Sequence, residues 1–163
     1  MLGALAAHAA ARPGAAVVDT CLRTVSTSPN VRYIPIAADA FQVTEDEEAG
    51  ETDIALQYGR DTVGTWEVKT PQAFGLLFNG KKTPLARVVR LDKDKPPAAF
   101  NTYEAIWGEA REGRHSYICA TFNLDGPGKS GRFQNVRGLY LIDRRARNGV
   151  TYYTLGHVGA AGK

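Results

Sequence analysis

The chain has 163 residues, 44% of them apolar and 23% charged, and a formal net charge of +3. These values are ordinary for a folded protein, and no stretch approaches the roughly 20 consecutive apolar residues that a membrane helix needs. Composition therefore argues against a membrane protein and against a disordered chain. We expect a single domain over residues 1–163 with a core of its own.

The charges are unevenly distributed along the chain. Residues 1–110 carry 11 basic and 14 acidic side chains, whereas residues 111–163 carry 9 basic and 3 acidic ones. A local excess of positive charge attracts anionic partners, so one hypothesis is a nucleic-acid or ribonucleoprotein accessory role through this C-terminal basic region. The chain as a whole lacks the strong basicity of a dedicated nucleic-acid binder.

The N-terminal region combines an alanine-rich segment with an amphipathic pattern. Residues 1–14 are expected to be a peripheral segment; they lack the positively charged start of a secretory signal, and the chain has no Asn-X-Ser/Thr site. We therefore expect a cytoplasmic or other intracellular location, with secretion or a periplasmic location left open. A helix is predicted over about 15–25 by the helical spacing of Val17, Val18, Cys21, Leu22 and Val25.

The two cysteines, Cys21 and Cys119, are too few for a disulfide-built scaffold. They are compatible with one disulfide, but two buried thiols are the simpler expectation, since free cysteine is usually a small buried apolar residue. Cys21 falls on the buried stripe of the predicted helix, and both faces of the strand that carries Cys119 are expected to be covered.

Strand and turn patterns follow the helix. Residues 31–36 predict a strand that Pro35 confines to the edge of a sheet. Residues 44–53 contain six acidic and no basic side chains, which favours a solvated, mobile loop. Two hairpins are then predicted, one from runs 54–58 and 65–69 and one from runs 73–78 and 86–91.

Residues 101–112 have the best helix pattern in the chain. Asn101 and Glu104 have capping-box spacing. The helical face would consist of Tyr103, Ile106, Trp107 and Ala110, and Gly113 would end the helix. Residues 116–122 predict a strand that places Ile118, Ala120 and Phe122 on one face and Tyr117 and Cys119 on the other.

The C-terminal part predicts a hairpin around Asn148-Gly149, formed by runs 139–142 and 150–155. With these two residues at the centre of the turn, Arg144 lies opposite Tyr153 and Arg145 opposite Tyr152. The same counting places Ile142 opposite Leu155 and Tyr140 opposite His157. The base of this hairpin is apolar and its tip carries Arg144, Arg145 and Arg147, so the tip is expected in solvent or against a partner.

These elements predict an α+β fold: a twisted, mainly antiparallel sheet of six to eight strands, covered on one face by two or three helices. A curved sheet closed by a helix commonly encloses an apolar pocket. The leading functional hypothesis is therefore a non-catalytic binding or protein-interaction domain, with a protein partner or a small apolar ligand. Its contacts would come from the curved sheet and the basic tip, through Trp66, Trp107, Tyr140, Tyr152, Tyr153, Arg144, Arg145 and Arg147.

A small cofactor-independent enzyme is the alternative from another class. Its acid or base would be Asp143 or His157, in an apolar pocket between sheet and helix. Cys119 with His157 is a further candidate, as a nucleophile and its base. Three histidines and two cysteines are a thin supply for a metal site, so we expect no metal and no cofactor.

Overall fold

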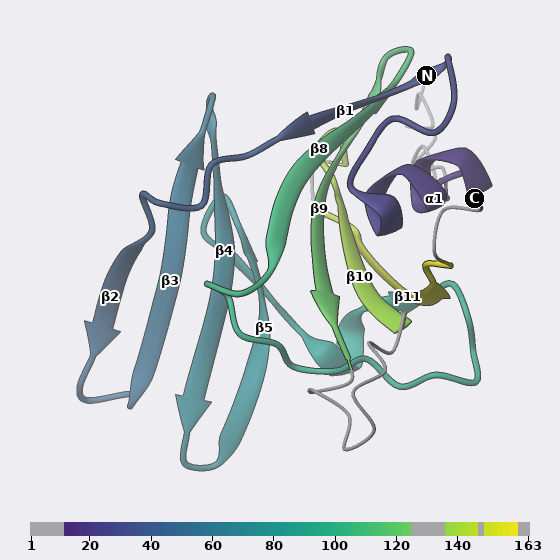
Figure 1. Cartoon of the computed structure of the whole chain (residues 1–163). Coiled ribbons are helices and arrows are strands. Elements are labelled where there is room, and N and C mark those ends of the chain that lie inside the picture. Colours follow the sequence, from purple (N-terminus) through teal and green to yellow (C-terminus); the bar gives the residue numbers. More distant parts are fainter. Residues whose placement is uncertain (1–11, 125–135, 147–148, 160–163) are drawn as a thin grey trace, which may run out of the picture.

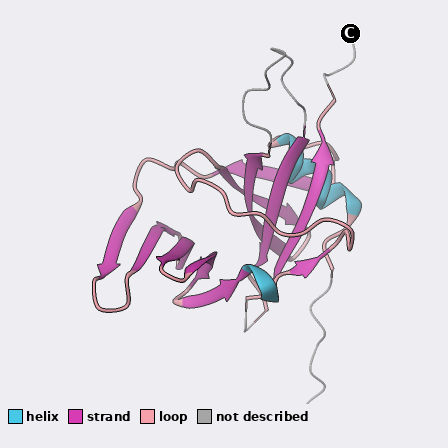
Figure 2. Ribbon diagram, turned by 90° about the horizontal axis from the view of Figure 1, so that it is seen from below, coloured by secondary structure: helices cyan, strands magenta, loops and turns pink. Residues whose placement is uncertain are grey.

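The computed structural model describes residues 12–124, 136–146 and 149–159. Its strands form two sheets, drawn in Figures 1 and 2. Sheet A has the order β1 (Val31–Pro35), β8 (Ile106–Glu112), β9 (His115–Asn123), β10 (Val136–Asp143), β11 (Thr151–His157) and β7 (Val89–Arg90). Sheet B has the order β2 (Gln42–Asp46), β3 (Glu51–Tyr58), β4 (Asp61–Lys69), β5 (Gln72–Phe78) and β6 (Lys81–Pro84). Neighbouring strands are antiparallel except β11 and β7.

The predicted α+β fold, with two or three helices over one sheet, is wrong. The described residues contain one α-helix, α1 (Ala15–Arg23), and a 3-10 turn (Leu85–Arg87), while most of the rest is strand. α1 packs on the outer face of sheet A, and sheet B covers the opposite face. The second cover of sheet A is therefore another sheet, which makes the protein a β-sandwich with one helix.

Each face of sheet A belongs to a different core. The core between the sheets is formed by Trp107, Ile118, Phe122, Tyr140, Ile142 and Tyr153 of sheet A with Leu56, Val63, Leu76 and Phe78 of sheet B. The core under the helix is formed by Val17, Cys21 and Leu22 with Val31, Ala110, Tyr117, Cys119, Leu139, Leu141 and Tyr152. Burial on both faces explains why β9 and β10 contain nearly continuous apolar runs.

The helix near residue 15 is confirmed, and a covalent bond joins it to sheet A. Cys21 of α1 and Cys119 of β9 form a disulfide, and both are fully buried. The predicted burial of both cysteines is confirmed. The simpler expectation of two free thiols is wrong. Arg137 donates a hydrogen bond of 2.7 Å to the carbonyl of Leu22 near the end of α1, where unpaired helix carbonyls accept cationic donors.

The helix predicted over 101–112 is wrong. The Asn101 side chain accepts a hydrogen bond from the Tyr103 amide, and the Asn101 backbone carbonyl accepts one from the Ala105 amide. The capping-box residues therefore form a turn instead of a helix start. Strand β8 then begins at Ile106 and pairs with both β1 and β9. Trp107 faces the core between the sheets and Ala110 the core under the helix. Tertiary pairing on both sides outweighs the local helix signal.

Of the two hairpins predicted for the region of sheet B, one is present and the other has a different second strand. The 54–69 hairpin is confirmed as β3 and β4. β5 pairs with β6, immediately after the Asn79-Gly80 turn, and not with residues 86–91. Both turn residues have positive φ, 49° and 79°, as a type I′ turn requires. The acidic run predicted as a loop is a hairpin, because β2 ends at Asp46 and β3 begins at Glu51.

The C-terminal hairpin exists, but its register differs from the predicted one. Tyr140 pairs with Tyr153 instead of His157, so β11 is shifted by four residues. The last pair is Ile142 with Thr151, and Asn148 of the predicted two-residue turn lies outside the described residues. An even shift keeps each side chain on its predicted face, which is why the predicted division into two faces holds.

Candidate functional site

Sheet B curls so that the face turned away from sheet A is concave. Lys82 of β6 contacts Glu51 and Asp53 of β3, with 3.1 Å between Lys82 Nζ and Asp53 Oδ1. Three strand spacings separate β3 from β6, about 14 Å in a flat sheet. The lysine side chain reaches across the concave face to these carboxylates. The edge strand β6 is therefore curled toward β3.

Two glycines allow this curvature. A Cβ at Gly64 would lie 1.8 Å from the carbonyl oxygen of Ile54, and one at Gly75 would lie 2.2 Å from that of Thr83. Both positions are too close for any side chain. A Cβ at Gly75 would also lie 2.6 Å from Trp66 Nε1, so the indole rests on this glycine. Glycine at these points lets the backbone of β4 approach that of β3 closely, and the backbone of β5 that of β6.

A groove with a volume of about 640 Å³ occupies the concave face. Its central row runs across all five strands through directly paired residues: Gln42, Ala55, Gly64, Leu77 and Lys82. Gly64 has no side chain and the β3 backbone lies against it, so the lining comes from the other four residues of this row. The remaining lining residues are Ala40, Thr44, Asp53, Leu56, Gln57, Thr62 and Gly80. The groove thus combines an apolar floor with hydrogen-bonding side chains, as ligand sites usually do.

One polar atom on this face, Trp66 Nε1, is buried without a hydrogen-bond partner. Its direct neighbour across β3 and β4 is Asp53, whose buried Oδ1 is ion-paired with the Lys82 ammonium at 3.1 Å. Burial raises the pKa of Asp53. Trp66 is 9% exposed and belongs to neither hydrophobic core. Buried polar groups without partners are uncommon in proteins, so the unpartnered indole N–H points to a ligand with an acceptor.

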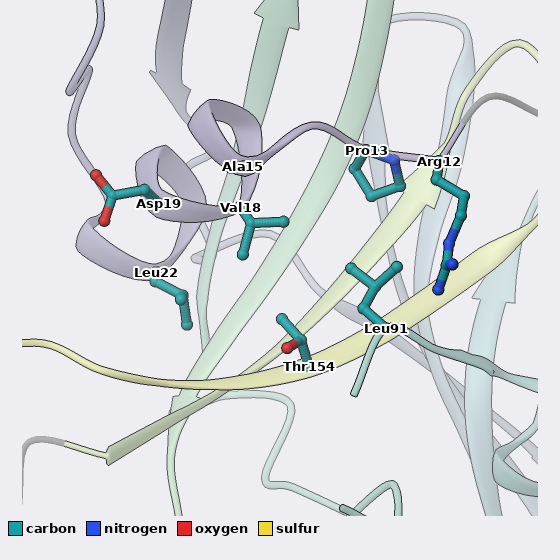
Figure 3. A pocket seen from close by; sticks show the side chains of 8 residues that line it. All are labelled: Arg12, Pro13, Ala15, Val18, Asp19, Leu22, Leu91 and Thr154. Atoms are coloured by element: carbon teal, nitrogen blue, oxygen red, sulfur yellow. The ribbon is translucent and has the colours of Figure 1, made fainter. Parts of the chain in front are cut away.

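A second hollow, with a volume of about 520 Å³, lies between α1 and β11 (Figure 3). Its apolar wall comes from Val18, Leu22 and Leu91, with Arg12 and Asp19 at its margins. None of the residues lining it carries a buried unpaired polar atom. This hollow lacks the feature that distinguishes the groove on sheet B.

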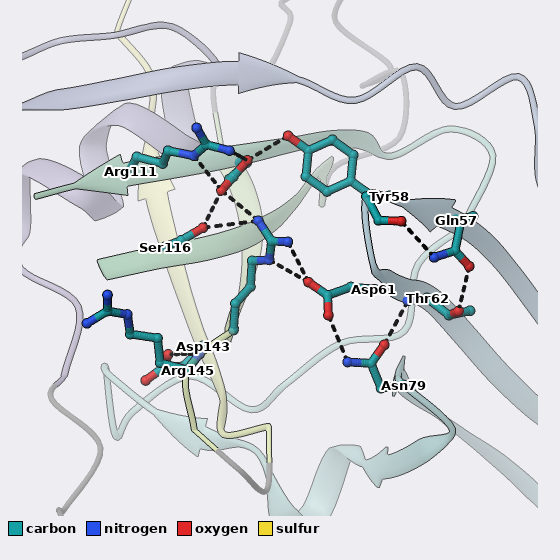
Figure 4. A network of polar contacts seen from close by, with 12 residues as sticks. Gln57, Tyr58, Asp61, Thr62, Asn79, Arg111, Ser116, Asp143 and Arg145 are labelled. Carbon is teal, nitrogen blue, oxygen red and sulfur yellow. Dashed lines mark hydrogen bonds and ion pairs between the residues drawn. The ribbon is translucent and has the colours of Figure 1, made fainter. Parts of the chain in front are cut away.

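The most extensive polar network joins the two sheets (Figure 4). Glu109 of β8 is fully buried and accepts hydrogen bonds from Tyr58 at 2.6 Å, Arg111 at 2.8 Å and Ser116. It also pairs with Arg144 at 2.7 Å. The Arg144 guanidinium in turn donates to Asp61 of β4 at 2.7 Å. The buried carboxylate is thus satisfied from both sheets, which is what burying a charge requires.

Glu109 makes the fold sensitive to acid. Burial raises the pKa of Glu109, but hydrogen bonds from Arg111, Ser116 and Tyr58 and the charge of Arg144 outweigh this effect, and the pKa falls from 4.5 to about 2. A carboxyl with a lowered pKa stabilises the fold above its unfolded pKa and loses that contribution as the pH falls through the folded value.

The shift corresponds to roughly 3 kcal/mol. We expect the difference in free energy of unfolding between wild type and Glu109→Gln to shrink by about this amount between about pH 6 and about pH 2. Urea unfolding at both pH values measures it. A difference that stays constant with pH would contradict the ionised state assigned to Glu109.

The aromatic residues expected at a binding surface lie inside. Trp107, Tyr152 and Tyr153 are 1%, 2% and 1% exposed, and Trp107 Nε1 donates to the carbonyl of Thr102 at 3.0 Å. Tyr140 is also buried and donates to the carbonyl of Ala98. Of the predicted aromatic contacts, only Trp66 lies on the concave face of sheet B. The other four belong to the two cores.

The three arginines expected at the hairpin tip have different surroundings. The side chain of Arg144 is 20% exposed and lies over the Tyr58 ring, within the Glu109 network. Arg145 is exposed, and its amide donates to the Asp143 carboxylate at 2.9 Å. Arg147 lies outside the described residues. Arg144 therefore stabilises the sandwich from within.

The candidate catalytic residues do not come together. Asp143 is 4% exposed at the end of β10 and accepts the amide of Arg145. His157 is exposed at the end of β11, next to Val136. Cys119 is bonded to Cys21, so its sulfur is not available as a nucleophile for a pair with His157.

The groove cannot be predicted from the sequence because its residues come from five strands whose order one sequence does not reveal. Two local signals were present. Gly64 and Gly75 stand inside strand-type runs, where glycine commonly marks a bend or a close backbone approach. Asn79-Gly80 is a two-residue hairpin turn that fixes β5 against β6.

Comparison with protein-family models, curated proteins and solved structures found no match for this chain. Among residues 12–124, 136–146 and 149–159, no three His, Cys, Asp or Glu side chains gather closely enough to hold a metal ion. The described part of the chain also has no helix with the length and apolar character to cross a membrane.

Proposed function

We propose that this protein is a non-catalytic binding domain whose binding surface is the concave face of sheet B. The observation that carries the proposal is the buried indole Nε1 of Trp66, which has no hydrogen-bond partner and stands next to Asp53, a residue of the groove that crosses five strands. A ligand that offers an acceptor to the indole would satisfy this group. Satisfying one buried polar group contributes about 1–3 kcal/mol, which is enough to give selectivity.

The surroundings of the groove support binding and not catalysis. Its polar lining consists mainly of glutamine and threonine side chains, which orient a ligand through hydrogen bonds but do not exchange protons near neutral pH. Asp53 is paired with Lys82, and Glu51 contacts the same lysine. The rigid support comes from sheet A, against which the opposite face of sheet B packs. A preformed groove on a packed sheet needs little ordering when a ligand binds.

A groove-filling variant tests the proposal. In Ala55→Phe the new ring enters the groove that Ala55 lines, so ligands are expected to lose access. Val43→Phe adds the same ring at a position that is 50% exposed on the other face of sheet B, and serves as the matched control. Soluble fragments that carry amide, hydroxyl or amine groups are screened against wild type by NMR. Binders of the wild type should lose binding to Ala55→Phe and keep it with Val43→Phe.

The result that would overturn the proposal is equally clear. Fragments that bind wild type and Ala55→Phe alike, or a screen without any binder, would show that the concave face is not a binding surface. Thermal unfolding of both variants establishes that each keeps the fold.

A further inference from the structure

One edge of sheet B is open for pairing. β2 is the outermost strand, all five of its residues are exposed, and no strand in the described part of the chain pairs with its outer side. The edge strands β1 and β6 each end in a proline, Pro35 and Pro84, whereas β2 contains none. An exposed strand edge offers a row of N–H and C=O groups to an added strand.

The charge around this edge is strongly acidic. Residues 44–53 carry Glu45, Asp46, Glu47, Glu48, Glu51 and Asp53 and no basic side chain. Lys82 contacts Glu51 and Asp53 from β6, and the other four carboxylates are exposed. A second copy of this chain would bring two acidic edges together, and like charges directly opposite each other destabilise strand pairing. The complementary occupant is a basic extended segment.

The register of β2 on β3 specifies which positions of an added strand would be basic. Asp46 pairs with Glu51 and Thr44 with Asp53, all on the concave face. A side chain opposite Asp46 would lie two strand spacings, about 10 Å, from Glu51, which arginine can span. On the other face Val43 pairs with Ile54 and Glu45 with Thr52, so an intervening position opposite Val43 would meet apolar side chains.

We propose that β2 receives, as a sixth strand of sheet B, an extended segment of a partner protein with basic side chains at alternate positions and apolar ones between them. This inference rests on the proposed function, since it names the ligand of the same concave face. The Lys82 ammonium contacts the Glu51 and Asp53 carboxylates, so these two residues already bind one cation of the chain itself. A cationic side chain of the partner would share these carboxylates with Lys82.

Two peptides of identical composition test the segment. The probe is a short synthetic peptide of alternating arginine and valine, and the control has its arginines in one block and its valines in another. Strand addition requires alternation, so we expect the alternating peptide to bind the full chain about tenfold more tightly or better. Isothermal titration calorimetry measures both affinities. Equal affinities would reduce the effect to general charge attraction and overturn the inference.

Two double variants with the same charge change test the position. Asp46→Asn with Glu51→Gln removes carboxylates on the concave face, whereas Glu45→Gln with Glu48→Gln removes one on the opposite face and one in the turn. We expect the first pair to weaken the alternating peptide about tenfold and the second about twofold. Equal weakening by both pairs would overturn the strand assignment, as would a dimer formed through β2 without peptide.

The outcomes separate this inference from the proposed function. Fragment binding that Ala55→Phe abolishes, together with no binding of the alternating peptide, would overturn the basic-strand ligand and leave the binding domain in place. Absence of both would overturn both. Peptide binding accompanied by slower exchange of the β2 backbone amides would support both, because only a paired strand protects them.

Discussion

Reduction of the Cys21–Cys119 disulfide should lower the free energy of unfolding by about 4.7 kcal/mol, the value that loss of loop-closure entropy gives for a loop of this length. The two cysteines are separated by 98 positions and join α1 to the centre of sheet A. Without the bond, α1 is held by the apolar contacts of its buried face and by hydrogen bonds such as that from Arg137.

Urea unfolding with and without dithiothreitol measures this difference. The double variant Cys21→Ala with Cys119→Ala is the control, and its stability should not respond to the reductant. Titration of thiols should find none in the native wild-type protein and two after reduction and unfolding. Wild-type protein that unfolds identically in both conditions would contradict the disulfide. A confirmed disulfide would also favour an oxidising compartment, against the intracellular location expected from the sequence.

The second large effect is expected at Arg144. Arg144→Ala removes the side chain that pairs with Glu109 and Asp61 and leaves a fully buried carboxylate with fewer partners. Breaking a buried ion pair by removing one partner costs about 3 kcal/mol or more. Arg145→Ala is the matched control, because its side chain is exposed and a surface substitution changes stability by about 0.5 kcal/mol or less.

Chemical denaturation of the two variants distinguishes the roles of adjacent arginines. Equal stability of Arg144→Ala and Arg145→Ala would contradict the role of Arg144 in the Glu109 network and return it to the exposed tip, in solvent or against a partner, that the sequence pattern predicts. Arg111 remains beside Glu109 in both variants, at 2.8 Å, so the carboxylate keeps one cation. The expected loss at Arg144 is therefore partial, and the variant should still fold.

Local patterns in the sequence predicted most strands and the faces of several. Alternation in 116–122 correctly assigned Ile118 and Phe122 to one core and Tyr117 and Cys119 to the other. This succeeded because the side-chain period of a strand does not depend on its neighbours. It failed over 101–112, where the same residues satisfy a helical stripe and an alternating strand, and pairing with β1 and β9 decides between them.

Features that depend on distant contacts could not be predicted. The register of the C-terminal hairpin pairs Tyr140 with Tyr153, which differs from the pairing that a two-residue Asn148-Gly149 turn gives. Gly149 has a φ of 53°, and a Cβ there would lie 3.2 Å from the Phe78 ring of sheet B, a contact that no local pattern contains. The groove likewise depends on the reach of Lys82 across to Asp53, which requires the strand order and the curl of sheet B.

The indole N–H signals of the two tryptophans test the binding surface most directly. Trp66 Nε1 has no hydrogen-bond partner, whereas Trp107 Nε1 donates to Thr102 inside the core between the sheets. When isotope-labelled protein is titrated with the binders from the fragment screen or with the alternating peptide, we predict that the Trp66 signal shifts and the Trp107 signal stays in place. Binding that leaves the Trp66 signal unchanged and instead shifts amides around Val18 and Leu91 would place the site at the hollow beside α1 and contradict the assignment to sheet B.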